Sequence, residues 1–222
     1  MADYIDKNII LQAYINIDKD LKKIPPTKRS KIESHLLEFA RARTNFFIES
    51  DTQVEIEVTS GSIKNKITVY GTLAAIGISN YSSFREGVIL IYSDVKRLSE
   101  LMIGESLYEF GARSVDFLRV EARVGVIGSV HRIVKGLESI SLATENSGIR
   151  RINRYFEKVN NEIERILTIL KTEEDKVFLK KGLLESANTI PRKPRRPQKG
   201  NHPLDQITLY EREYRRLFDL LK

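Results

Sequence analysis

The stretch that decides the fold is "IRRINRYFEKVNNEIERILTIL", residues 149–170. Its apolar side chains recur at alternating steps of three and four residues, which is the spacing of one narrow stripe on a helix. We therefore expect this helix to bury the stripe against a neighbouring helix. The residues of this stripe, called the heptad seam below, are Ile149, Ile152, Phe156, Val159, Ile163, Ile166 and Leu170.

The segments on either side repeat the helical pattern. Apolar residues within 127–137 take the same steps, and the short connection "ESISLATENSG" predicts an antiparallel hairpin with the seam helix. Thr172 and Asp175 have the spacing of a helix cap, which predicts another helix over residues 173–188. A terminal helix is predicted after the linker, with its own apolar stripe at Ile207, Tyr210, Tyr214, Leu217 and Leu221.

The N-terminal part predicts a further helical hairpin. Apolar residues at steps of three and four indicate an amphipathic helix over residues 3–24, and Pro25 with Pro26 would end it. Ser30 and Glu33 have the spacing of a capping box at the start of a second helix. Two antiparallel helices would therefore precede the first strand.

A small β element follows this hairpin. In "QVEIEVTSG", residues 53–61, apolar and acidic side chains alternate, and a period of two is typical of a half-exposed strand. "KITVYG" could be the returning strand, so the β element is placed near residues 53–70. Residues 67–79 fit a strand or an apolar helix, whereas 88–110 favour a helix. The predicted fold is mainly α, with antiparallel helical hairpins or a bundle and this small β element.

The chain is expected to divide into four segments. These are 1–110, with the helical hairpin, the β element and an apolar helical region; 111–190, with the seam hairpin; 191–203, a basic Pro-rich linker; and 204–222, a docking helix.

Most of the net charge lies in one short tract. Residues 191–200, "PRKPRRPQKG", contribute +5 of the net charge of +7, so the charges of the remaining residues nearly cancel. A protein built around nucleic acid spreads its basic residues over one face of the fold. We therefore expect at most weak, sequence-blind phosphate binding. The basic residues assigned to it are Arg192, Lys193, Arg195, Arg196 and Lys199 of the tract, and Arg150, Arg151 and Arg154 of the seam helix.

The sequence shows little catalytic chemistry. Cysteine is absent and histidine occurs three times, which excludes disulfides, thiol nucleophiles and thiolate metal sites. His35, Glu38 and His131 could form a two-histidine, one-carboxylate site only if the fold joined them, and their spacing does not support that contact. "RVGVIGSVHR" lacks the third glycine of a dinucleotide fingerprint and the lysine of a phosphate loop, so its glycines are interpreted as a break between two helices. No catalytic residue, cofactor or metal is predicted, and His131 and Arg132 are marked for testing.

Residues 67–92 form the most apolar region of the chain. Their length approaches that of a bilayer span, but Asn80, Arg85 and Glu86 lie near the centre, where a charged residue costs about 2.5 to 3.5 kcal/mol. A buried hairpin is the preferred interpretation, with "SFREG" as its polar turn and Arg85 as the residue to test.

The sequence therefore predicts a non-enzymatic interaction or adaptor protein that acts through helix–helix assembly with itself or with a partner protein. The alternative is a nucleic-acid-associated protein that uses the basic tract. The third hypothesis is a membrane-acting effector that uses residues 67–92. A cytoplasmic location is expected because Asp3 and Asp6 stand where a secretory signal carries basic residues.

Overall fold

The structure is a computed structural model that describes residues 9–48, 52–59, 61–146, 148–194 and 203–222. It is mainly helical, as predicted, with six α-helices and a four-stranded antiparallel sheet within these ranges. The chain groups into two compact units. The first unit contains residues up to 78 and 89–128, and the second contains 79–88 and 129–222.

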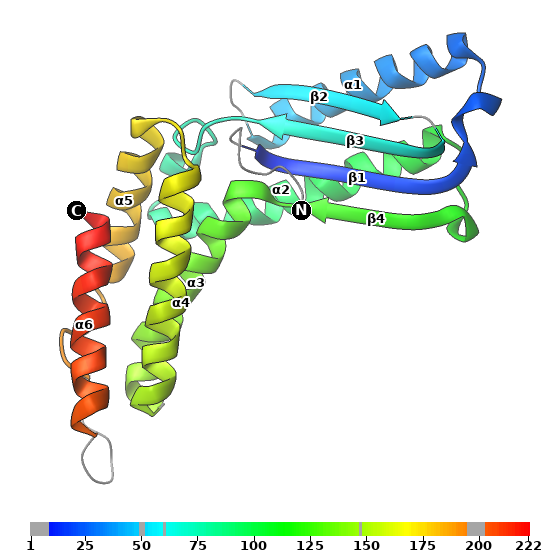
Figure 1. The fold of residues 1–222 in the computed structure, drawn as a ribbon. Helices are drawn as coiled ribbons and strands as arrows, with labels where there is room; N and C mark the ends of the chain where they lie inside the picture. Colours follow the sequence, from blue (N-terminus) through cyan, green and yellow to red (C-terminus); the bar gives the residue numbers. More distant parts are fainter. Residues whose placement is uncertain (1–8, 49–51, 60, 147, 195–202) are drawn as a thin grey trace. The chain divides into compact units, whose positions relative to one another are not determined.

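The sheet lies in the first unit. Its strands are β1 (Ile9–Asp20), β2 (Gln53–Thr59), β3 (Ser62–Tyr70) and β4 (Phe117–Arg123), in the spatial order β2-β3-β1-β4, and every neighbouring pair is antiparallel. β2 and β4 are therefore the two edge strands (Figure 1).

Two helices contribute buried residues to this unit's core. α1 (Pro26–Ile48) runs along one face of the sheet (Figure 1), and its buried side chains recur every four residues from Ile32 through Leu36 to Ile48. α2 (Phe84–Glu109) is anchored to the sheet by a buried hydrogen bond, which Asn65 Nδ2 on β3 donates to Ser106 Oγ at 2.9 Å. Ser106 Oγ in turn donates to the carbonyl of Met102 at 2.7 Å, so this turn of α2 is fixed in register against the sheet.

The predicted helix over residues 3–24 is wrong. In the described part of that range, residues 9–20 form β1, which pairs with β3 on one side and β4 on the other. Pro26 begins α1 instead of ending a helix, since proline fits the first helical turn, where its missing N–H needs no partner. The predicted capping box is also wrong, because Ser30 and Glu33 lie inside α1.

The predicted β element is confirmed as the hairpin of β2 and β3, and the ambiguous residues 67–70 belong to β3. Strand β4, by contrast, was not predicted. It comes directly before Gly125, so the glycines of "RVGVIGSVHR" do not mark a break between two helices. A Cβ atom at Gly125 would lie 1.9 Å from the carbonyl oxygen of Ile9, so the start of α3 can pass beside β1 only without a side chain there.

The second unit contains the predicted helical hairpin and its extensions. α3 (Gly125–Asn146) begins in the first unit and continues into the second, where α4 (Ile149–Ile169), α5 (Glu173–Ala187) and α6 (Leu204–Leu221) follow. The Thr172 cap is confirmed, since its hydroxyl accepts a hydrogen bond from the Asp175 N–H at 3.2 Å. α3 and α4 approach closely at Gly136, where a Cβ atom would lie 2.4 Å from Val159 Cγ2.

The apolar region 67–92 does not form a hairpin around a polar turn. β3 ends at Tyr70, one 3-10 turn follows at Ile78–Asn80, and "SFREG" leads into the first turn of α2. Among the helices of the described ranges, none combines the length and apolarity needed to cross a membrane.

Candidate functional site

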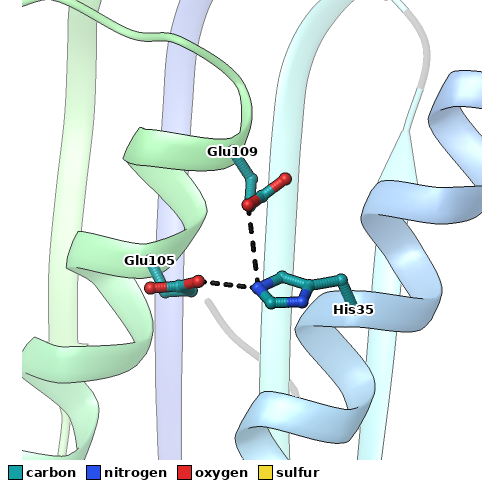
Figure 2. A group of neighbouring side chains, drawn as sticks. All are labelled: His35, Glu105 and Glu109. Atoms are coloured by element: carbon teal, nitrogen blue, oxygen red, sulfur yellow. Dashed lines mark hydrogen bonds and ion pairs between the residues drawn. The ribbon is translucent and has the colours of Figure 1, made fainter.

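One histidine and two glutamates meet in the first unit. His35 projects from α1 toward Glu105 and Glu109 on α2 (Figure 2). His35 Nε2 lies 2.7 Å from Glu105 Oε1 and 3.7 Å from Glu109 Oε1. The histidine is half exposed and each glutamate is about a quarter exposed, so water and ions can reach the cluster.

The local sequence explains how the cluster forms. Glu105 and Glu109 are four residues apart on α2, so they lie on the same face, one turn from each other. Ser106, next to Glu105, is hydrogen-bonded into the core, and Leu36, next to His35, is fully buried. Buried neighbours thus fix both helices, while the cluster itself faces solvent.

The two carboxylates change the acidity of the histidine. The hydrogen bond to Glu105 raises the pKa of His35 above its ordinary value, partial burial opposes the rise, and the charges of Glu109, Glu105 and Glu38 add to it. With a proton on both ring nitrogens, His35 forms an ion pair that links α1 to α2. With a neutral ring, the cluster offers one imidazole nitrogen and two carboxylate oxygens to a cation.

Only part of this cluster could be read from the sequence. His35 was considered, but with Glu38 and His131, and the structure brings it to Glu105 and Glu109 instead. His131 is not part of the cluster; its pKa is lowered by burial and by the nearby charges of Lys135 and Arg132. In the sequence, the four-residue spacing of Glu105 and Glu109 in "GESLYEF", residues 104–110, indicates that these two carboxylates share one helical face.

The edge strand β4 exposes apolar side chains. Phe117 is 41% exposed, Leu118 59% and Val120 39%, and Val115 just before the strand is 80% exposed. Large apolar residues along an unpaired strand edge are a template for pairing with another strand, and proteins usually protect such edges with charge.

The opposite edge strand is protected in that way. β2 carries Glu55 and Glu57 between its apolar residues, and Glu57 forms an ion pair with Lys66 on β3. The two edges of one sheet therefore differ in character. The charges of β2 are both acidic, whereas β4 carries charges of both signs and exposes large apolar side chains.

The charged residues of β4 are arranged around its open edge. Glu121 accepts hydrogen bonds from Arg119 and Arg123 on the same strand. Both guanidinium groups also lie over the ring of Tyr14 on β1, at 5.8 and 5.5 Å from its centroid. The side chains of Arg119, Glu121 and Arg123 therefore alternate in charge along one face of β4 and are held in place by their mutual hydrogen bonds.

The heptad seam forms core in the second unit. All seven of its residues are buried, and Phe156 meets Tyr210 of α6 edge to face, with ring centroids 5.1 Å apart. Asn160 Nδ2 donates to the Glu213 carboxylate at 3.0 Å, which fixes the register of α4 on α6. Of the α6 residues assigned to the interface, Tyr210 and Leu217 are buried and Tyr214 is half buried. α4 and α6 therefore bury their stripes against each other within one chain.

The basic residues assigned to phosphate binding fall into two groups. Arg150, Arg151 and Arg154 are exposed on α4, and Arg151 bonds the hydroxyl of Tyr155. Arg192 and Lys193 are also exposed. The other three assigned residues of the tract, Arg195, Arg196 and Lys199, lie outside the described residues.

The described end of the basic tract meets α6. Arg192 and Lys193 line a surface hollow with residues of α6 and its end. The other lining residues are the basic Arg215 and Lys222, the acidic Glu211 and Asp219, and the aromatic Tyr214 and Phe218. The described residues of the tract include no aromatic ring, and the rings at this hollow are in contact with each other, with the centroids of Tyr214 and Phe218 4.6 Å apart. Phosphate binding by the tract stays a prediction.

The remaining residues marked for testing form ion pairs in the second unit. Arg85 pairs with Glu138 of α3. Arg132 and Arg165 both pair with Glu162, at 2.8 and 2.7 Å. Burial disfavours the Glu162 carboxylate, but hydrogen bonds from these two arginines overcome it and lower its pKa to about 2. These contacts tie α3 to α4 and to the first turn of α2.

Comparison with known protein families, with curated proteins and with solved structures finds no match to this chain.

Proposed function

We propose that this protein is an interaction protein that associates with a second copy of itself through the edge strand β4. The association expected from the sequence was helix to helix, but the heptad seam is covered by α6 of the same chain. Among the described residues, no further strand pairs with the outer edge of β4, and its large apolar side chains are partly exposed. The proposal keeps the adaptor role and the cytoplasmic location, and it moves the contact from the helices to the sheet.

The single observation that carries this proposal is the self-complementary sequence of β4, "FLRVEAR". Two copies paired antiparallel about Val120 place Arg119 of each copy opposite Glu121 of the other. Opposite charges directly across an antiparallel pair stabilise it, and like charges destabilise it. Registers centred on Arg119 or on Glu121 put like charges opposite each other. A register about Ala122 pairs Glu121 with Arg123 but overlaps only residues 121–123, whereas the register about Val120 pairs the whole strand.

The apolar side chains favour the same register. Val120 would face Val120 of the second copy across the two-fold axis, and Leu118 would face Ala122. Val120 pairs with Ile15 in the β1 ladder, and paired residues of an antiparallel ladder share one face of the sheet. The association would therefore cover exposed apolar surface of β4 on the side that already contains the core.

The other edge of the sheet argues against pairing there. A second copy paired about Ile56 of β2 would place Glu55 opposite Glu57 at two positions. Acidic residues on an edge strand are a recognised protection against such pairing. Self-association is therefore assigned to β4 alone.

Charge reversal on the full-length chain tests the proposal. Multi-angle light scattering should give twice the mass of the 25.6 kDa chain for the wild type. Arg119→Glu should weaken association at least tenfold, because four carboxylates then face one another across the interface. The double variant Arg119→Glu, Glu121→Arg should restore it. Glu55→Arg on β2 is the control and should associate like the wild type.

Circular dichroism on each variant separates loss of association from loss of folding. A wild-type chain that stays monomeric at every concentration would refute the proposal. So would an Arg119→Glu variant that is folded and associates as strongly as the wild type, since its contact would then lie elsewhere.

A further inference from the structure

We infer that His35, Glu105 and Glu109 form a binding site for one first-row divalent cation, of which Zn²⁺ is the best match. The site is independent of the proposed association, because its residues lie on α1 and α2 and not on β4.

The geometry of the cluster suits a small ion. One ligand atom from each of the three residues lies within 4.8 Å of the other two, and Nε2 of His35 is 2.7 and 3.7 Å from the two carboxylate oxygens. Around an ion with bonds of about 2.1 Å, neighbouring ligand atoms stand about 3.0 to 3.4 Å apart. The observed separations bracket that range, so small side-chain rotations complete a coordination shell. Figure 2 shows both carboxylates directed at the same ring nitrogen of His35.

The kinds of ligand define the class of ion. One imidazole and two carboxylates form a mixed nitrogen and oxygen set, which suits Zn²⁺, Mn²⁺ and Fe²⁺. Mg²⁺ and Ca²⁺ prefer oxygen ligands alone. Three protein ligands on a partly exposed site leave at least one position for water, as in zinc sites that bind or activate a small molecule.

The local charge favours a divalent cation. With His35 neutral, the two ligand carboxylates carry two negative charges, which one divalent ion neutralises. Glu38, one turn from His35 on α1, adds to the negative potential at the ring. The ion would replace a hydrogen bond between His35 and Glu105 with coordination bonds to both helices.

The backbone of the site is already fixed. Ser106 is held by Asn65 and by the Met102 carbonyl in the core of the unit, and this fixes the turn that carries Glu105. Leu36 anchors the neighbouring residue of α1. Only the three ligand side chains need to move on binding, while the helices that carry them stay in place, so little ordering opposes it.

Calorimetry on the full chain tests this site with Zn²⁺ as the probe. We expect one ion per chain, and at least tenfold weaker binding in His35→Ala and in Glu109→Gln. Glu38→Gln is the matched control, because it removes a nearby acidic charge without removing a ligand. It should bind within about threefold of the wild type.

Co²⁺ provides a second readout, since its visible absorption spectrum reports the ligands directly. The wild type should show a spectrum that changes when His35 is replaced, and circular dichroism should show all variants folded. Undetectable Zn²⁺ binding, or unchanged affinity in His35→Ala, would overturn the inference. An equal loss in Glu38→Gln and Glu109→Gln would also overturn it, because diffuse charge rather than coordination would then hold the ion.

Discussion

The seam helix α4 and the central strand β1 both contain apolar residues at regular steps, yet one is a helix and the other a strand. In α4 the buried positions follow steps of three and four in alternation, from Ile149 to Leu170. In β1, Ile9, Ala13 and Ile17 stand four apart, which fits a helix. The same strand also buries Leu11 and Ile15 between them, and all five residues follow a step of two.

The two elements differ in whether their buried residues include steps of three, which we call odd steps. A step of four residues is one helical turn and also two strand repeats, so a run of fours does not separate a helix from a strand. A step of three changes faces in a strand, and therefore only a helix keeps alternating threes and fours on one side. α4 has three such odd steps, whereas the buried run of β1 from Ile9 to Ile17 needs none.

The largest effect on stability is expected for a substitution in the heptad seam of α4. Ile163 is fully buried, and Ile163→Asp would place an unpaired charge among apolar side chains. We expect the free energy of unfolding to fall by about 4 kcal/mol or more, enough to unfold a marginally stable unit. Thermal and urea unfolding followed by circular dichroism measure this effect.

Lys158→Asp is the matched control, since Lys158 is exposed on the same helix and receives the same side chain. It should change stability by less than about 0.5 kcal/mol. Equal melting of the two variants would show that the stripe is not buried.

A substitution at Ile15 tests whether residues 9–20 form a strand. A helix over 3–24 would leave Ile15 off its apolar stripe, whereas in β1 this side chain is 1% exposed. Ile15→Ala should therefore cost about 2 to 4 kcal/mol through the cavity it leaves. Urea unfolding measures it, with Asp18→Ala, at an exposed position of the same strand, as the control. A cost for Ile15→Ala as small as for Asp18→Ala would contradict the strand.

The smallest effect is expected on the polar side of α4. Glu162→Gln removes the carboxylate that Arg132 and Arg165 hold at a pKa of about 2. Both arginines are more than half exposed, so solvent screens the pairs, and we expect a loss of about 1 kcal/mol at neutral pH.

The pH dependence has a definite sign. A lowered pKa in the folded state stabilises the fold above the ordinary glutamate value, and this contribution disappears as the pH falls toward 2. The stability difference between wild type and Glu162→Gln should therefore shrink below about pH 4.5 and vanish near pH 2. Glu157→Gln, at an exposed position of α4, is the control. A constant difference down to low pH would exclude the ionic cause.

The sequence predicted the second unit better than the first. The seam, the Thr172 cap and the terminal helix could be read from local spacing, because each depends on residues one or two turns apart. β4 alternates apolar and charged residues from Leu118 to Arg123, a period of two that our sequence prediction missed; the structure shows that this stretch pairs with the edge of β1. For the candidate metal site, 70 residues separate His35 from Glu105, and no local pattern links them.

The sequence by itself determined the helix-rich class, the hairpin around the seam and the concentration of charge in residues 191–200. These are properties of side-chain periodicity and composition, which act over short stretches of chain. Only the tertiary structure decided that β1 is a strand, that α6 covers the seam and that His35 meets two glutamates. The reason is that strand pairing and side-chain clusters join residues distant in sequence, and the free energy of those contacts outweighs local preference.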